Sequence, residues 1–234
     1  MTAAAEIVRI VPAGDAALLL EFPQRIDVDI NSSAAALAGR LQRRCGGAIR
    51  DAVVGYATVT VYFDPLIVDA AWMESEMRAA AAEVEHAPAS AGTQVDVPVC
   101  YGGEFGPDLA DVATFGGLTT DEVIARHSSA TYRVYLVGFV PGFAYMASVD
   151  PSIAAPRRPA PRPSVPAGSV AIAGPQTGIY PAVTPGGWNI IGRTALKPYD
   201  PARQDPFLLR TGDTVRFRAV SRDAYDRSIV GQTS

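Results

Sequence analysis

The sequence predicts a small α+β domain over residues 1–90 and a mainly-β barrel domain over residues 91–234. In the first stretch, two helix patterns alternate with pairs of short strand patterns, which is typical of a sheet covered by helices on one side. In the second, many short strand patterns are separated by sharp turns, which is typical of a barrel. We expect the boundary in H-A-P-A-S-A-G, residues 86–92, because Pro88 stops the preceding helix.

The first domain is predicted to open with a hairpin, a helix and two more strands. The apolar runs I-V-R-I-V and A-L-L-L-E-F flank a turn and predict the hairpin over residues 7–22. Apolar side chains then recur on one face of residues 28–44, which predicts a helix capped by Asp27 or Asp29. Residues 49–63 predict the second pair of strands.

Three further helices are expected. The first covers residues 70–86, with an apolar stripe on one face and Asp69 as its N-cap. The second covers residues 107–116, because proline favours the first helical position and glycine the end. The third runs over residues 119–127 and opens with a Thr-x-x-Glu capping box.

The predicted barrel strands lie at residues 94–100, 132–139, 189–192 and 214–220. Between residues 138 and 187, frequent prolines and glycines exclude an ordinary helix. The same segment carries many aromatic and aliphatic side chains, which a disordered linker would lack. It therefore predicts short strands and rigid, packed turns that shape a small-molecule pocket.

Composition limits the classes of function. Hydrophobic residues make up 48% of the chain, enough for a substantial core, and the net charge of −4 argues against a general nucleic-acid role. Lys197 is the only lysine, and arginine is the better residue for bidentate binding of carboxylate or phosphate. Cys45 and Cys100 form no C-x-x-C pair, which predicts two buried thiols in a reduced cytosol. No signal-peptide pattern and no long apolar run is apparent, so a soluble, cytoplasmic protein is expected.

Several catalytic motifs are absent from the sequence. His86 and His127 are far apart and no cysteine cluster accompanies them, so no metal site is predicted. No P-loop and no G-x-G-x-x-G occurs, so the nucleotide of an ATP-driven reaction would bind elsewhere or through an unfamiliar site. Ser169 lacks a G-x-S-x-G context, which favours a strand-entry serine. His127 could act as an acid or base or contact phosphate, or it could simply favour the helix dipole.

Three arginines and two short polar residues are candidate ligands of a small anion. Arg157, Arg162 and Arg193 could clamp a carboxylate or a carboxyphosphate-like group, or they could solvate a turn-rich rim. Rigid neighbours favour the binding role for Arg162 and Arg193. Gln176 and Thr177 lie on a predicted turn, where they could bind an amide or carboxylate or cap the turn internally.

Five strings, in this order and spacing, resemble the family of the B subunit of bacterial 5-oxoprolinase, which is also labelled allophanate hydrolase subunit 1 and includes KipI. They are C-Y-G-G-E-F-G-P-D-L, G-F-V-P-G-F-A-Y-M, P-R-x-x-x-P-R-x-x-V-P-A-G-S-V-A-I-A-G, Q-T-G-I-Y-P and P-G-G-W-N-I-I-G-R-T. The likeness spans nearly the whole chain. One departure is visible: Pro159 and Pro163 are additional prolines, which should stiffen the loop beside Arg162.

The resemblance implies an α+β N-terminal domain and a cyclophilin-like C-terminal barrel. It also implies a partner, the C subunit of 5-oxoprolinase (allophanate hydrolase subunit 2), with the A subunit as a further partner. Together they would cleave 5-oxoproline to glutamate with ATP, and this chain alone would be inactive. We predict catalytic roles for Arg162, Arg193 and His127, and substrate binding by Gln176, Thr177 and Tyr180.

Two alternatives stay open at this point. The same pocket could serve allophanate or urea-derived carboxylate chemistry, because both substrates are small amides. Alternatively, the chain could be a KipI-like inhibitor of a sensor histidine kinase, which would act by binding alone. Composition does not choose among the three.

Overall fold

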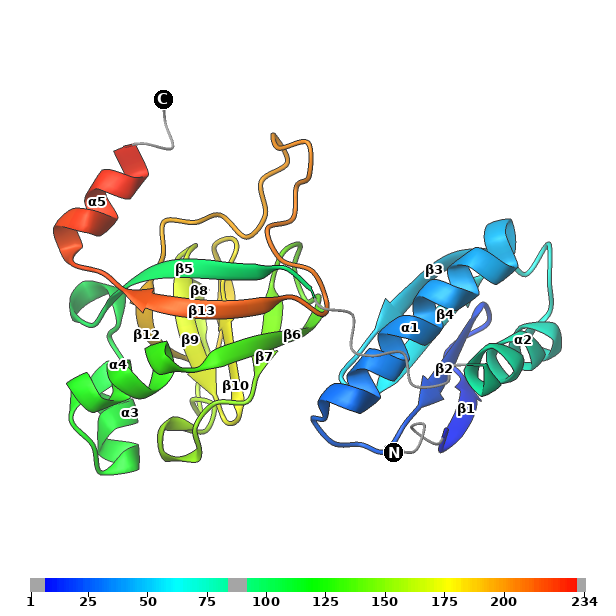
Figure 1. Ribbon diagram of the computed structural model, residues 1–234, viewed down its shortest axis with the longest axis horizontal. Coiled ribbons are helices and arrows are strands. Elements are labelled where there is room, and N and C mark those ends of the chain that lie inside the picture. Colours follow the sequence, from blue (N-terminus) through cyan, green and yellow to red (C-terminus); the bar gives the residue numbers. More distant parts are fainter. Residues whose placement is uncertain (1–6, 84–91, 231–234) are drawn as a thin grey trace. The chain divides into compact units, whose positions relative to one another are not determined.

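The computed structural model describes residues 7–83 and 92–230. Contacts divide the chain into two compact units, Met1–Ala91 and Gly92–Ser234 (Figure 1). The first unit contains an antiparallel sheet in the strand order β1-β2-β4-β3. Its strands are β1 (Arg9–Pro12), β2 (Ala17–Glu21), β3 (Ile49–Val54) and β4 (Thr58–Phe63).

Two helices bury one face of this sheet. α1 (Val28–Cys45) and α2 (Ala70–Ala82) share one hydrophobic cluster with the inward-facing residues of β2 and β4. Asp27 is the N-cap of α1, because its carboxylate accepts hydrogen bonds from two backbone N–H groups of the first turn. Asp69 caps α2 as the sequence predicts, with one hydrogen bond from the backbone N–H of Trp72. α2 ends at Ala82 with Glu83 as its C-cap, earlier than predicted, and residues 84–86 of the predicted extension lie outside the described residues.

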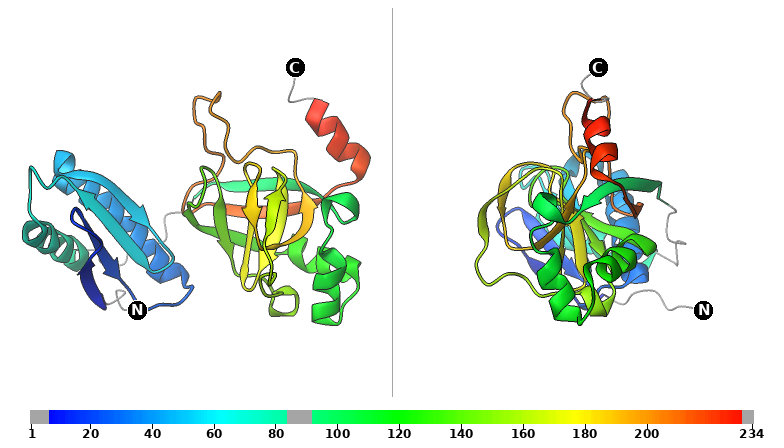
Figure 2. Two further views of the ribbon diagram at one scale, coloured as in Figure 1. Left: turned by 180° about the vertical axis from the view of Figure 1, so that it is seen from behind. Right: turned by 90° about the vertical axis from the view of Figure 1, so that its left-hand side faces the viewer.

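The second unit contains a closed barrel of seven strands in the order β10-β7-β6-β13-β5-β12-β9. The β13–β5 pair is parallel and the other pairs are antiparallel. Figure 2 shows the barrel from behind and from one side. The strands are β5 (Gln94–Tyr101), β6 (Thr131–Val137), β7 (Ala144–Ala147), β9 (Ser169–Ala173), β10 (Gln176–Ile179), β12 (Asn189–Arg193) and β13 (Thr214–Ala219). The barrel predicted from short strands and sharp turns is confirmed.

A separate two-stranded sheet of β8 (Arg162–Val165) and β11 (Thr184–Gly186) lies outside the barrel wall. Val165 of β8 packs in a second hydrophobic cluster with Ala171 and Ile190 of the wall. Their neighbours Ile172 and Ile191 belong to the interior cluster instead. Because strand side chains alternate between faces, this wall has one core inside the barrel and another outside it.

The helices of the second unit are α3 (Leu109–Gly116), α4 (Thr120–Ser129) and α5 (Arg222–Val230). Short 3-10 turns occur in the second unit at η2 (Gly103–Phe105) and η3 (Pro151–Ile153), and in the first unit at η1 (Gly46–Ala48). The predicted capping box of α4 is confirmed, since Thr119 and Glu122 bond reciprocally. The predicted start of α3 at Pro107 is wrong: the helix begins two residues later, at Leu109, and the side chain of the preceding residue, Asp108, makes no capping hydrogen bond. No signal in the sequence predicted α5.

In the part of the chain that the structure describes, no helix combines the length and apolar character needed to cross a bilayer.

We predict that Thr119→Ala lowers the free energy of unfolding of the second unit by about 1 kcal/mol, because it removes the N-cap acceptor of α4. Urea unfolding followed by Trp188 fluorescence, in a Trp72→Phe background, measures this change. Glu122→Gln is the control, since its carboxamide oxygen can still accept the Thr119 backbone N–H. Equal stability of Thr119→Ala and the parent would contradict the assigned cap.

Candidate functional site

A pocket of about 310 Å³ lies against the outer face of the barrel wall. The β8–β11 sheet, the turn after β6 and the loop before β8 contribute to it together with the wall. Its lining residues are Phe139, Phe143, Tyr145, Arg157, Gln176, Tyr180, Pro185, Gly186 and Trp188. The size suits one small molecule, at the lower end of the range for ligand pockets.

Aromatic rings form the apolar part of this pocket. The Phe143 ring meets Tyr145, Tyr180 and Trp188 edge-to-face, with centroids 4.7, 5.2 and 5.3 Å away. Phe143, Tyr180 and Trp188 are all buried, so packing holds their rings in place. The pocket thus has a preformed apolar surface suited to a small ring.

The charged group of the pocket is the Arg157 guanidinium. Arg157 is exposed, and among residues 7–83 and 92–230 no carboxylate pairs with it. Burial raises the pKa of Tyr145 and of Tyr180, and the positive charge of Arg157 opposes both shifts. Both phenols therefore stay protonated at neutral pH. The pocket offers a cation, a carboxamide from Gln176 and hydroxyl groups to an anionic ligand.

The structure brings two of the six predicted site residues into this pocket, Gln176 and Tyr180. Thr177 follows Gln176 on β10 and is fully buried, with its side chain on the interior face of the barrel wall. Arg162, Arg193 and His127 do not line the pocket, and each is engaged elsewhere. Arg157, for which the sequence left a binding and a solvating role open, lies in the pocket instead.

Arg162 is bound by a buried carboxylate. Both terminal nitrogens of its guanidinium donate to Asp108, at 2.8 and 2.7 Å, and Arg158 donates to the same carboxylate at 2.7 Å. Asp108 also accepts the backbone N–H of Ile190, and its side chain is only 2% exposed. The hydrogen bond to Asp108 is the largest cause that raises the pKa of Arg162. This ion pair ties the loop that carries Arg157 to the barrel wall.

Asp108 is the residue that sequence reasoning missed. Its local sequence indicates a helix start, where aspartate is common. In the structure its side chain caps no helical N–H and turns to the two arginines instead. Nothing local in the sequence indicates partners about fifty residues away.

Arg193 is the last residue of β12 and lies near α5. Its guanidinium carbon is 4.7 Å from the centroid of the Phe105 ring, and that of Arg222 is 4.4 Å from the same centroid. Phe105 also contacts Tyr225 of α5, with ring centroids 4.6 Å apart. These contacts give Arg193 a place in the packing of α5 against the barrel.

His127 belongs to α4 and is fully buried, in contact with side chains of the barrel interior. Its Nδ1 is 2.8 Å from the Tyr101 hydroxyl and its Nε2 is 2.9 Å from Thr177 Oγ1. Thr177 donates its single hydroxyl proton to the carbonyl of Ala171, at 3.0 Å. We therefore assign the ring proton to Nε2, which donates to Thr177, while Nδ1 accepts from Tyr101. Burial lowers the pKa of His127 to about 3, so the ring is neutral at physiological pH.

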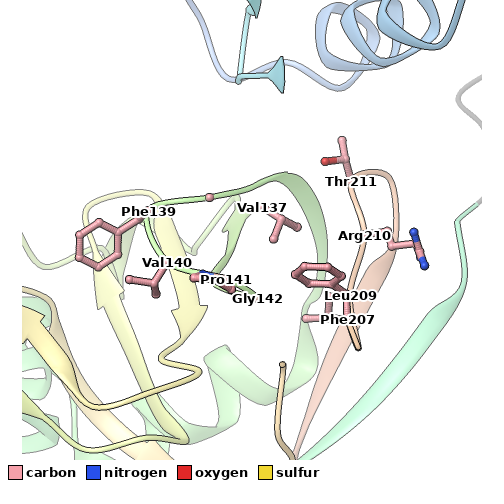
Figure 3. Close-up of a pocket in the computed structure, with 10 residues that line it drawn as sticks. Val137, Phe139, Val140, Pro141, Gly142, Phe207, Leu209, Arg210 and Thr211 are labelled. Carbon is pink, nitrogen blue, oxygen red and sulfur yellow. The ribbon is translucent and has the colours of Figure 1, made fainter. Parts of the chain in front are cut away.

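A second, more open pocket of about 510 Å³ lies between the turn after β6 and the segment before β13 (Figure 3). Figure 3 shows the Phe139 ring at the opposite end of this turn from Phe207 and Leu209. Its lining is mainly apolar, and Arg210 at its edge pairs with Asp205. Phe139 has a φ of 70° and lines both pockets. Arg157, Gln176 and Tyr180 line the 310 Å³ pocket instead.

No group of three or more histidine, cysteine or acidic side chains that could hold a metal ion occurs within the described ranges.

Comparison with known proteins places the chain in a class. The family described as "Carboxyltransferase domain, subdomain C and D" matches residues 8–209, so the chain is a member of that family. The B subunit of 5-oxoprolinase from Bacillus subtilis (strain 168) is 39% identical over 222 residues, which cover 91% of this chain and 92% of the relative. Within the carboxyltransferase class, the chain belongs to the family of 5-oxoprolinase B subunits, and the resemblance predicted from sequence is confirmed.

Solved structures show the same fold. The crystal structure of TTHA0988 matches with a TM-score of 0.78 and 40% identity, and the match covers 88% of this chain and 40% of the solved chain. The urea carboxylase of Kluyveromyces lactis matches with a TM-score of 0.79 over 96% of this chain and 24% of that chain. Its 19% identity shows a shared fold alone.

We predict that Asp108→Asn lowers the free energy of unfolding of the second unit by about 3 kcal/mol, because two guanidinium groups lose their buried counter-charge. Asp96→Asn is the matched control: Asp96 also binds two arginines, but on the exposed surface, and about 1 kcal/mol or less is expected. Urea unfolding measures both variants. Equal losses in the two would contradict the role assigned to burial.

We predict that His127 stays neutral, with its proton on Nε2, from pH 4 to 8, which ¹⁵N NMR of the imidazole nitrogens detects. Its signals are identified by their loss in His127→Gln. Because the folded-state pKa lies below the unfolded value, the unfolded chain binds the extra proton as pH falls below 6.5. This histidine therefore lowers stability by up to about 1.4 kcal/mol per pH unit between pH 6.5 and 3. An imidazole that titrates near pH 6.5 in the folded protein would contradict the burial.

Proposed function

We propose that this chain is the B subunit of an ATP-dependent 5-oxoprolinase, which cleaves 5-oxoproline to glutamate together with a C subunit and with the A subunit as a further partner. Membership of the family of 5-oxoprolinase B subunits supports the proposal. The observation that carries it for this chain is the pocket. There Arg157, which has no carboxylate partner among the described residues, and the carboxamide of Gln176 adjoin an aromatic surface.

5-Oxoproline matches this pocket in three respects. It is an anion at neutral pH, so its carboxylate would pair with the Arg157 guanidinium. Its lactam has one N–H and one carbonyl, which a single carboxamide such as Gln176 can bind reciprocally. Its methylene groups would lie against the rings of Phe143 and Trp188. The chain's contribution is to bind and orient the lactam ring.

The partners supply what this chain lacks. A lactam is a stable amide, and its cleavage needs activation, for instance phosphorylation of the carbonyl oxygen by ATP. This sequence contains no P-loop, so we assign nucleotide binding to another chain of the complex and expect this chain to be inactive alone. A stable complex would bury on the order of 1,600 Å² or more. We also propose that the two compact units are separate domains, with a cyclophilin-like barrel as the second, in a cytoplasmic enzyme.

Direct catalytic contacts of Arg162, Arg193 and His127 stay predictions. Their observed partners favour structural roles: Arg162 binds Asp108, Arg193 packs on Phe105, and His127 is buried. We therefore place substrate recognition at Arg157, Gln176 and Tyr180.

Arg157→Gln should raise the KM for 5-oxoproline at least about tenfold in the reconstituted complex, because a charge-assisted pair to the carboxylate is lost. ATP-dependent formation of glutamate from 5-oxoproline measures the activity. Arg218→Gln is the matched control, since Arg218 is an exposed arginine of β13 whose partner Asp96 keeps Arg216. It should leave the KM unchanged.

Three outcomes would contradict the proposal. An unchanged KM in Arg157→Gln excludes the pocket as the substrate site. If the complex cleaves allophanate and leaves 5-oxoproline intact, the substrate is allophanate and not 5-oxoproline. A pulldown with the intact chain could recover a sensor histidine kinase and never a C subunit. That result would show that the chain is an inhibitor and not an enzyme subunit.

A further inference from the structure

His127 lies on the opposite side of the barrel wall from the pocket. Its partner Thr177 and the pocket residue Gln176 are consecutive on β10, so their side chains leave the strand on opposite faces. The Thr177 hydroxyl contacts His127 inside the barrel, whereas Gln176 lines the pocket outside. A displacement of Thr177 along or across the strand would therefore also displace Gln176.

The barrel is held weakly by backbone pairing at this point. β10 pairs with β9 at four positions, from Gln176↔Ala173 to Ile179↔Val170. It pairs with β7 at only two, Gln176↔Ala147 and Thr177↔Met146. The β7–β10 pairing is therefore as short as the β5–β12 pairing, which also has two positions. A side-chain link at Thr177 adds a constraint at this barrel seam, where the backbone pairing is short.

His127 itself has a fixed position. Its ring stacks on Phe217 of β13, with centroids 4.5 Å apart, and its Nδ1 accepts the Tyr101 hydroxyl of β5. Its backbone carbonyl accepts the hydroxyl of Tyr132 on β6, at 3.1 Å. His127 thus links three strands on one side of the barrel, through its imidazole and its backbone carbonyl, to β10 on the other.

We propose that His127 is a positioning residue: through Thr177 it fixes β10 at the barrel seam and so holds the Gln176 carboxamide at the depth at which the pocket binds its ligand. This inference rests on the proposed function of the pocket. His127 is fully buried and lines no part of the pocket, so it acts on the ligand only through β10.

The decisive variants change Thr177 by one group at a time. Thr177→Val keeps the shape but removes the hydroxyl, so Nε2–H loses its acceptor, whereas Thr177→Ser keeps the hydroxyl. In the reconstituted complex, we expect Thr177→Val to raise the KM for 5-oxoproline about tenfold with kcat changed less than about twofold, since ground-state binding is weakened. Thr177→Ser should keep the parental KM. These kinetic measurements do not require His127→Gln, so failure of that variant to fold does not affect them.

A double-variant cycle separates positioning from general stability. If Thr177 acts through Gln176, adding Thr177→Val to Gln176→Ala raises the KM no further. If the two increases multiply instead, or if Thr177→Val has the parental KM, the inference is overturned.

The cycle also distinguishes the two proposals. A raised KM in Gln176→Ala together with a parental KM in Thr177→Val overturns the positioning role and leaves the pocket as the substrate site. A parental KM in Gln176→Ala overturns both. As a readout independent of activity, the ¹⁵N signals of His127 should report Nε2–H in the parent and in Thr177→Ser; a proton on Nδ1 in the parent overturns the inference.

Discussion

The barrel wall formed by β9, β10 and β12 is buried on both of its faces, and the pocket depends on this. One face belongs to the barrel interior and the other to the cluster beneath the β8–β11 sheet. Polar side chains in such a wall need protein partners, because little water reaches them. Thr177 bonds to the Ala171 carbonyl, and Asn189 donates to the Pro156 carbonyl at 2.8 Å. These bonds satisfy Thr177 and Asn189, and the bond from Asn189 also fixes the loop that carries Arg157.

Two neighbouring arginines in that loop have opposite environments. Arg158 is partly buried and shares the carboxylate of Asp108 with Arg162, as a desolvated charge requires. Arg157 is exposed in the pocket, and within the described residues it has no carboxylate partner. The paired arginines hold the loop in place, and this leaves the third available to a ligand. Arg158 and Arg162 are therefore structural, because they are paired with Asp108, whereas Arg157 is a candidate binding group.

The sequence predicted those features that local signals govern. The N-cap at Asp69 and the capping box at Thr119 are specified within three or four residues and form as expected, and of the two candidate caps of α1 the structure has Asp27. Local signals failed where a distant partner intervened. Asp108 belongs to a helix start by its local sequence, yet it faces arginines fifty residues later. Prolines and glycines between residues 138 and 187 correctly indicated packed strands and turns.

What the sequence by itself determined was the class of fold, the family and the segment that forms the pocket, because these follow from periodicity, turn residues and motif order. The tertiary structure alone decided which side chains meet. It placed Gln176 and Tyr180 with Arg157 in one pocket and removed Arg162, Arg193 and His127 to other environments. The physical reason is that strand side chains alternate between two buried faces, so residues adjacent in a motif can lie on opposite sides of the barrel wall.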